Sequence, residues 1–428
     1  MTKGKKVKLK KALGLFETTM GGVGIILGAG IYALVGKAAA LGGNAVWISF
    51  AIAALVATLT GLSYAELSSM FPKAGAEYVY TEHAFGRRIA FFVGFFLITG
   101  LTIAASAVSL GFAGYLHAIF GTPVIYGAIA LLLACTLLLL YGVKQSAWVG
   151  VIFTLVEVGG LFIIISIGLP KLGNMNLMEM TPAGFSGVFA AAALIFFAYI
   201  GFEEIVNLAE ETRGAVKTIP KAVVLSIIIT TIIYILVALA AISVMGWQAL
   251  GASKAPLADV AATAFGPGVF TMISAIALFS TANTVLLILL ANSRLAFGMA
   301  RENKYSKALS WLHPKTQTPW IAILVIVLFA IGFLFAGEIK AVADMTNMAI
   351  FITFIVINSA VITLRFKESE MKRPFKVPGK IGKVPLVPVL GILVNIFMLS
   401  YVGTRALMFG VAFAVIAFVL YEILDRTK

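Results

Sequence analysis

Apolar runs of about 20 residues recur along the whole of this 428-residue sequence, and they limit its fold more than any other feature. A run of this length crosses a bilayer as an α-helix, whereas a membrane β-barrel is built from alternating segments of about 10 residues. The composition agrees: 61% of the residues are hydrophobic and 12% are charged, and the mean hydropathy is +1.05. Soluble domains carry about 25% charged residues. The sequence therefore predicts an all-α integral membrane protein in the lipid bilayer.

The apolar runs divide the chain into about 12 membrane helices, the usual span length being about 20 residues. The expected helices are 13–38, 44–70, 87–118, 123–142, 147–169, 183–212, 219–246, 268–300, 319–336, 340–364, 384–403 and 405–424.

The Lys and Arg residues are distributed very unevenly over the loops of this arrangement. If the N-terminus is inside, 27 of the 32 lie in inside segments, beginning with the basic residues 1–11. Because Lys and Arg gather on the cytoplasmic side of membrane proteins, the asymmetry predicts that both termini are cytoplasmic. The outside segments then hold only Lys37, Lys171, Lys254, Lys340 and Arg405.

The first helix contains the stretch Gly21–Tyr32, GGVGIILGAGIY, which has five glycines in an apolar setting. Glycine weakens a helix by roughly 0.5–1 kcal/mol relative to alanine, so its repeated use needs a reason. One interpretation is close packing against another helix. The other is a deliberate break, which lipid tolerates only where the backbone lines a cavity or is buried in protein. Transporters use such breaks to bind substrates and ions.

A second interruption occurs five helices later, where Gly201 is followed closely by Glu203 and Glu204. Interruptions at corresponding places in two halves are typical of inverted-repeat transporters. We therefore expect a first repeat at 12–170, a second at 181–365, and two additional helices within 384–424.

Three strings resemble the amino acid–polyamine–organocation transporters, and within them a prokaryotic branch similar to the cationic amino acid transporters. The strings are GVGIILGAGIY, YAELSSMFPKAGAEYVYTEHAFG (64–86) and FFAYIGFEEIVNLAEETRGAVKTIPKA (196–222), and the match runs from about residue 12 to about residue 365. The resemblance implies a LeuT-type 5+5 inverted repeat with helices 1 and 6 broken in mid-membrane, and secondary active transport of amino acids by alternating access.

The resemblance also implies where an amino acid would bind. Its carboxylate would meet backbone amides at Ala29 and Gly30, after Gly28. Its ammonium group would meet carbonyls at Ile26, Phe197 and Ile200, next to Gly201. The charges fit, because helix N-termini favour anions and C-terminal carbonyls favour cations. Phe197 is either an aromatic gate or a core side chain.

Acidic residues inside the spans are functional candidates, since each costs about 2.5–3.5 kcal/mol at a helix centre. Glu17 either caps the first helix or gates the cytoplasmic side. We expect Glu203 to take part in coupling or gating and Glu66 to be structural. Glu210 and Glu211 have Arg213 nearby, which favours salt bridges.

Glu157 lies midway along the fifth helix, where proton-coupled relatives commonly carry a lysine. A buried carboxylate there can bind a proton. Alternatively, it can ligate sodium beside Ser280 and Thr281, or it is a static hydrogen-bonded acid. We expect Glu157 to be the coupling group, with a proton favoured over sodium. No intramembrane acid is dedicated to a cationic side chain, so we expect a small or medium neutral substrate, with cationic amino acids next.

Other classes find less support. The sequence lacks the HExxH and GxSxG signatures of enzymes and the repeated filter of a channel. Three histidines without ligand spacing predict no metal site, and we expect no cofactor and no nucleic-acid partner. No cleavable signal peptide is expected, and the plasma membrane is the expected location. An exchanger, a sodium symporter or a non-transporting amino acid sensor remains possible, and the oligomeric state, monomer or homodimer, stays open.

Overall fold

The computed structural model describes residue 9 and residues 11–253, 255–266, 268–303, 307–335 and 339–426. Most of the predicted basic N-terminus, residues 1–11, lies outside the described residues, as does Lys254. The described elements, in chain order, are α1 Leu15–Gly42, η1 Gly43–Ala45, α2 Val46–Met70, α3 Ala76–Phe85, α4 Arg87–Phe120, α5 Val124–Tyr141, α6 Val143–Gly168, η2 Leu169–Lys171, α7 Gly184–Ile195, η3 Phe196–Tyr199, η4 Glu203–Glu211, α8 Ala215–Ala252, α9 Pro256–Phe265, α10 Gly268–Asn303, α11 Trp320–Phe333, α12 Ile339–Lys367, β1 Lys380–Ile381, β2 Val384–Pro385, α13 Leu386–Leu399 and α14 Thr404–Arg426.

The predicted all-α membrane architecture is confirmed, because ten helical stretches of the described chain are long and apolar enough to cross a membrane. One of the ten joins the end of α1 to α2. The helices α11 and α13 have 14 residues each, or about 21 Å at 1.5 Å per residue, which is shorter than the spans expected at 319–336 and 384–403. The assignment of two inverted repeats stays a prediction.

Three helices are interrupted inside apolar sequence. Helix α1 leaves helical geometry at Gly28 (φ −29°, ψ −142°), inside the glycine-rich stretch. The sixth expected helix ends its α-helical part at Ile195 and continues as two 3₁₀ segments, with extended backbone at Ile200 and φ of 130° at Gly201. A third interruption, at Gly246 in α8 (φ 71°, ψ 164°), was not expected from the sequence.

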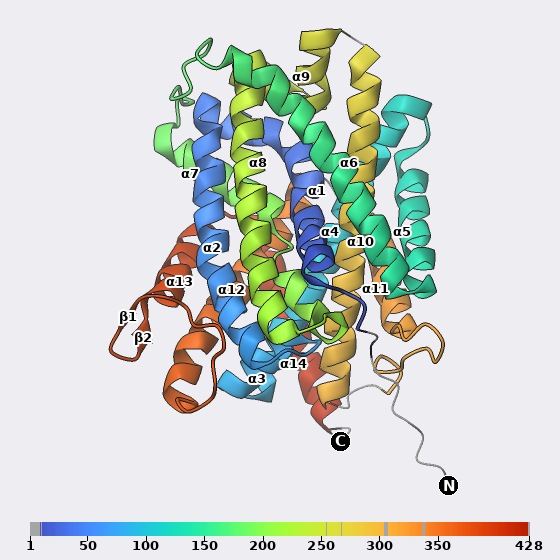
Figure 1. Cartoon of the computed structure of the whole chain (residues 1–428), viewed down its shortest axis with the longest axis vertical. Coiled ribbons are helices and arrows are strands. Elements are labelled where there is room, and N and C mark those ends of the chain that lie inside the picture. The colour runs from blue at the N-terminus through green and yellow to red at the C-terminus, as the bar shows by residue number, and fades with distance from the viewer. Residues whose placement is uncertain are drawn as a thin grey trace.

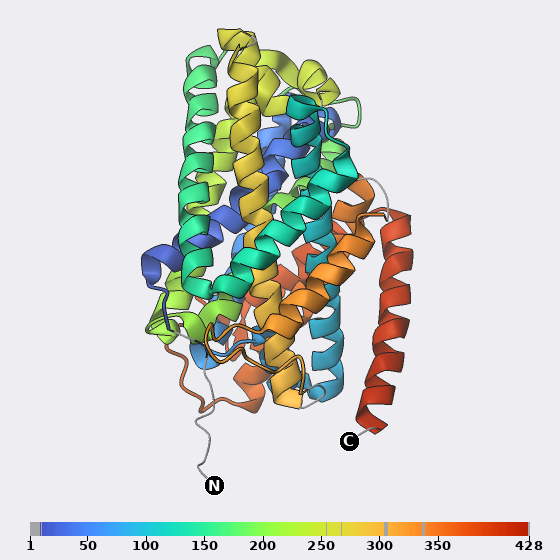
Figure 2. The same ribbon diagram turned by 90° about the vertical axis from the view of Figure 1, so that its right-hand side faces the viewer.

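Helix α1 lies in the middle of the molecule, in contact with α6, α7, α8 and α10 (Figure 1). Helix α14 lies at the edge, where it packs on α4 and α12 and leaves most of its surface uncovered (Figure 2). The interrupted part of α1 and segment η3, which packs on α1, are therefore surrounded by protein. Backbone groups freed from a helix can find hydrogen-bond partners there.

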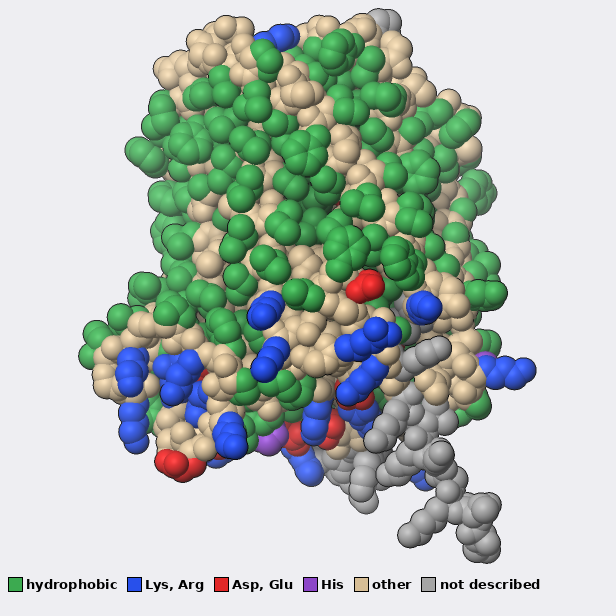
Figure 3. All heavy atoms as spheres, in the orientation of Figure 1, with side chains coloured by type: hydrophobic (Ala, Val, Ile, Leu, Met, Phe, Trp, Pro, Cys, Tyr) green, Lys and Arg blue, Asp and Glu red, His purple; other side chains and the backbone are tan. Residues whose placement is uncertain are grey.

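The surface of the molecule is divided between a broad apolar band and one charged end (Figure 3). The charged end carries most of the visible Lys and Arg side chains, and we call it the basic end. Helix α3 lies at this end of the molecule (Figures 1 and 3). The first turn of α1 and the last turn of α14 face the same half of the molecule (Figures 1 and 2).

Three short elements were not predicted. Helix α3 lies between two glycines of positive φ, Gly75 and Gly86, and α9 and the hairpin β1–β2 lie in other connections. Each is too short or too polar to give the apolar signal that identified the long helices.

Candidate functional site

The glycines of α1 allow two neighbouring segments to approach its interruption very closely. A Cβ atom added at Gly28 would lie 1.4 Å from Oγ1 of Thr284 on α10, and one added at Gly30 would lie 2.3 Å from Cβ of Ala198 in η3. At Gly201, whose φ is positive, an added Cβ would lie 2.2 Å from Cγ2 of Ile25. Both sequence interpretations therefore describe part of the geometry: the glycines permit close packing, and they lie where the backbone is interrupted.

A small cavity of about 10 Å³ lies where the interruptions meet. It is lined by Ile25, Ile26, Gly30, Ala104, Val108, Phe197, Ile200, Thr284 and Ile288. This set includes four of the seven residues expected to bind substrate. Of the other three, Ala29 and Gly201 are chain neighbours of lining residues, and Gly28 lies two positions from Ile26 and from Gly30. A volume of this size holds about one water molecule, so an amino acid would enter only after the surrounding helices move.

Tyr234 on α8 connects the interrupted part of α1 with η3, and it was not selected from the sequence. Its hydroxyl group donates toward the carbonyl oxygens of Ile26 and of Ala198, the latter at 2.8 Å. The Ile26 carbonyl, expected to meet the substrate's ammonium group, therefore has a protein donor in this structure. The available signal was a single phenol inside the apolar run IITTIIYILVAL.

Glu157 lies on α6, completely buried, next to α10. The hydroxyl group of Ser280 donates to its Oε1 at 2.5 Å, and its Oε2 has no hydrogen-bond partner among the described residues. Asn283 also approaches this carboxyl group, while its amide nitrogen donates to Oγ1 of Thr154 at 2.8 Å. No Lys, Arg or His of the described chain pairs with Glu157, so nothing basic compensates a negative charge there.

Of the two α10 hydroxyl groups expected beside Glu157, the structure brings only one into contact. Thr281 donates instead to carbonyl oxygens of its own helix, at Ala277 (2.7 Å) and Leu278 (3.1 Å). Among the described residues no group of three or more His, Cys, Asp or Glu side chains could hold a metal ion.

The two other acids expected at the site have different surroundings. Oε2 of Glu17 accepts a hydrogen bond from the Gly14 amide at 2.9 Å, which is the contact of an N-terminal cap. Glu203 is completely buried, and its Oε2 accepts from the Gly201 amide at 2.9 Å. Glu203 therefore helps to fix the backbone turn that interrupts the sixth span.

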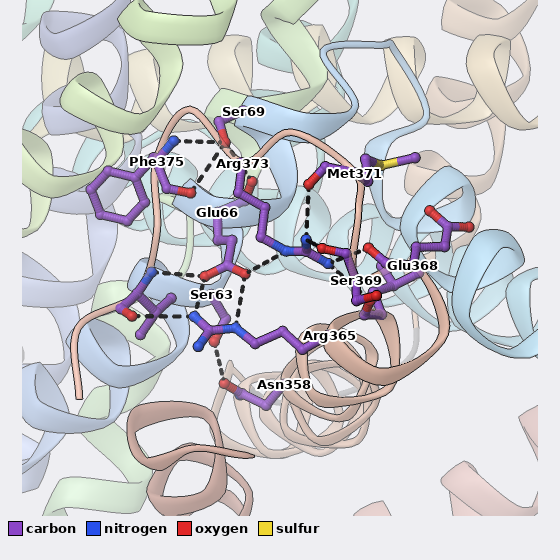
Figure 4. Close-up of polar contacts among 12 residues, drawn as sticks. Ser63, Glu66, Ser69, Asn358, Arg365, Glu368, Ser369, Met371, Arg373 and Phe375 are labelled. Atoms are coloured by element: carbon purple, nitrogen blue, oxygen red, sulfur yellow. Dashed lines mark hydrogen bonds and ion pairs between the residues drawn. The ribbon is translucent and has the colours of Figure 1, made fainter. Parts of the chain in front are cut away.

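At the basic end, Glu66 of α2 is held between two arginines (Figure 4). Arg365 of α12 donates to both of its oxygens, at 3.1 and 2.6 Å, and Nε of Arg373 lies 3.4 Å from Oε1. The Val377 amide donates to Oε2 at 2.7 Å. This carboxylate fastens the segment after α12 to α2, in line with the structural role expected for it.

Two further ion pairs hold segment η4 against α10. Glu211 and Arg294 form a bidentate pair with no exposed side-chain surface, both N–O distances being 3.1 Å, and Glu210 pairs with Arg301. Salt bridges were expected for both acids, but with Arg213. The structure shows that the partners come from α10, because η4 packs along that helix.

Comparison with known proteins gives a consistent result. The sequence profile of the amino acid permease family matches residues 13–421. The chain is 31% identical to the branched-chain amino acid permease BcaP of Bacillus subtilis, with 99% of this chain and 95% of that protein covered. It is 32% identical to the methylthioribose transporter of the same organism (96% and 93% covered). It is 29% identical to cationic amino acid transporter 4 of Mus musculus, covering 85% of this chain and 61% of that protein.

Proposed function

The chain belongs to the amino acid permease family of the amino acid–polyamine–organocation transporters, and we propose that it is a proton-coupled permease for small or medium neutral amino acids. Family membership makes it a multi-pass membrane transport protein for amino acids rather than an enzyme. The proposal goes beyond family membership in three respects, which are the substrate class, the coupling ion and the orientation in the membrane.

The lining of the small cavity supports a neutral substrate. None of its nine residues is charged, and most present aliphatic side chains or backbone. A lysine-like side chain would bury an ammonium group there without a carboxylate to pair with it, which is costly. The relative BcaP is named for branched-chain amino acids, a class whose aliphatic side chains suit such a lining. The backbone amides after Gly28 would bind the carboxylate that all amino acids share, and the carbonyls of η3 would bind the ammonium group.

The surroundings of Glu157 support coupling to a proton, and this is the observation on which the coupling proposal rests. A carboxylate with one unpaired oxygen and no basic partner is unfavourable in a buried site, whereas the protonated acid is neutral. Glu157 is on α6 and its donor Ser280 is on α10, and both of these helices contact α1. Proton binding and release at Glu157 would therefore change the contacts around the interrupted helix.

The orientation proposed is that the basic end faces the cytoplasm of a cell whose plasma membrane holds the protein, with both termini inside. The concentration of Lys and Arg at that end (Figure 3) supports it through the positive-inside rule. At this end the Glu211–Arg294 pair joins η4 to α10, and backbone hydrogen bonds from Ala12 and Leu13 to the Glu211 carbonyl join the chain before α1 to η4.

The substrate class is tested by counterflow into liposomes that contain the purified protein. We expect labelled alanine and leucine to be exchanged and labelled lysine not to be taken up. Ala104→Val narrows the cavity and should reduce leucine exchange relative to alanine by about tenfold, the usual effect of a methylene-sized change in an apolar pocket. Ala130→Val, at an exposed position of α5, is the matched control.

Three outcomes would overturn this assignment. Preferred exchange of lysine would make the substrate cationic. Equal effects of the two alanine variants would remove Ala104 from the site. A complete lack of flux, together with thermal stabilisation by an amino acid, would indicate a sensor on the same fold.

A further inference from the structure

We propose that Glu77, Glu203 and Glu204 form a second proton-binding site, separate from Glu157, at the junction of helix α3 with segment η4. The site lies at the basic end, and its ligand is one or more protons shared by three carboxyl groups. The inference does not depend on the proposed substrate or on the role of Glu157.

The three carboxyl groups are completely buried. Both oxygens of Glu204, Oε1 of Glu203 and Oε1 of Glu77 have no hydrogen-bond partner among the described residues. Glu203 and Glu77 lie within electrostatic range of the Glu204 carboxyl group. Three negative charges within electrostatic range of one another in a buried site would repel one another, so the group is stable only if it holds protons.

Two buried hydroxyl groups point to the same ligand. The phenol of Tyr64 on α2 lies close to the Glu77 carboxyl group and within electrostatic range of Glu203 and Glu204, and the phenol of Tyr80 on α3 lies within electrostatic range of Glu77. Neither phenol oxygen makes a hydrogen bond of good geometry among the described residues. A protonated carboxyl group can donate a hydrogen bond to a phenol oxygen, and it can also accept one from a phenol hydrogen. A carboxylate can only accept. Protonation would therefore relieve the repulsion between the acids and also give the buried phenols hydrogen-bond partners.

No basic side chain compensates this group. No Lys, Arg or His of the described chain acts on any of the three carboxyl groups. From α12 the aromatic ring of Phe354 packs on Tyr64. The charged groups between α3 and this segment lie at the far end of α3, where Lys367 donates to the His83 carbonyl and Glu368 lies 3.5 Å from the His83 ring. The α10 arginines next to η4, Arg294 and Arg301, are engaged by Glu211 and Glu210. The carboxyl groups also do not form a set of three that could hold one metal ion, which favours protons over a metal cation.

Hydrogen bonds join the site to the contact between η4 and the start of α3. The side chain of Asn207 in η4 accepts from the Ala76 amide and donates to Oε2 of Glu77, both at 3.0 Å. Oε1 of Glu210 accepts from the Ala74 amide, also at 3.0 Å. Loss of protons would place repelling charges on both sides of this junction, so we infer that proton release loosens α3 from η4.

The pH dependence of stability tests the site without any transport measurement. Burial raises the pKa of the Glu77 carboxyl group from 4.5 to about 8, although hydrogen bonds from the backbone and from Asn207 oppose the rise. The folded protein then binds more protons than the unfolded chain between these values, so its stability falls as pH rises through this window. Thermal unfolding in detergent should therefore give a lower Tm at about pH 9 than at about pH 6.

Glu77→Gln and Glu204→Gln, each isosteric with the protonated acid, should make this fall in Tm clearly smaller. Glu82→Gln, on the same helix but paired with Arg87 at a partly exposed position, should leave it unchanged. The infrared C=O band of protonated carboxyl groups, recorded at neutral pH, should be weaker in both cluster variants than in Glu82→Gln.

Two results would overturn the proposal. The first is an unchanged infrared band and an unchanged pH profile of Tm in both cluster variants. The second is a rise in Tm on replacing choline chloride with sodium chloride that both variants abolish, which would make the site one for sodium. If one variant fails to fold, the other gives the same two measurements.

Discussion

Seven glutamates of this protein, six buried and one (Glu210) partly buried, divide into two sets that differ in their partners. Glu66, Glu210 and Glu211 each pair with an arginine of α12, the following segment or α10. Glu157 and the cluster Glu77, Glu203 and Glu204 are just as buried or more so, and no basic residue of the described chain compensates them. The first set holds helices together as fixed charges. The second set can gain and lose protons, because only the neutral form suits its surroundings.

The largest loss of stability is expected on breaking the Glu211–Arg294 pair, which has no exposed side-chain surface. Arg294→Met removes the charge and keeps the bulk, leaving Glu211 buried without its partner. We expect a loss of about 3–5 kcal/mol of folding free energy, measured as a fall of Tm in detergent. The double variant Arg294→Met/Glu211→Gln should recover part of this loss. A single variant as stable as the wild type would contradict the comparison.

The same substitution should act in opposite ways on the two sets. Glu66→Gln takes the negative charge away from Arg365 and Arg373, and we expect a loss of about 2–3 kcal/mol, the range for hydrogen bonds to charged groups. Glu204→Gln replaces an acid that has no partner, so its effect at neutral pH should stay within about 1 kcal/mol or be stabilising. Tm would be measured for both variants under the same conditions. An equal fall of Tm in the two would contradict the division of these glutamates into a paired and an unpaired set.

The smallest effect is expected at the rim of the basic end. Lys73 pairs with Glu302 at 3.4 Å, with side-chain exposures of 47% and 28%. Lys73→Gln should change the stability by no more than about 0.5 kcal/mol, because exposed ion pairs contribute little. A fall of Tm comparable to that of Arg294→Met would show that the contribution of an ion pair to the stability of this protein does not depend on its solvent exposure.

The sequence predicted the features that depend on local pattern. Apolar length identified the long helices, and the clustered glycines of the first helix marked the place where α1 leaves helical geometry at Gly28. The depth of Glu157 in an apolar run selected it as a buried acid, and the structure places it in contact with Ser280.

Local sequence pattern did not predict contacts between distant residues, and the expected proximity of Ser280 to Glu157 came with the family resemblance. Glu66 and Arg365 are 299 positions apart, and Tyr234 lies 208 positions from Ile26, so no local pattern connects them. For Glu210 and Glu211 the neighbouring Arg213 suggested a partner, but helix packing supplied arginines from α10. The buried cluster was only half visible, because Glu77 lies on a short helix that apolar length could not reveal.

The central claim is that Glu157 carries the coupling proton of an amino acid permease, and accumulation in liposomes tests it most directly. Uptake of labelled alanine or leucine would be compared under an inward proton gradient, an inward sodium gradient and no gradient, for the wild type and for Glu157→Gln. The account predicts accumulation by the wild type under the proton gradient alone. In Glu157→Gln accumulation should be lost while exchange against preloaded amino acid continues. Accumulation driven only by sodium, or accumulation that Glu157→Gln leaves unchanged, would contradict it.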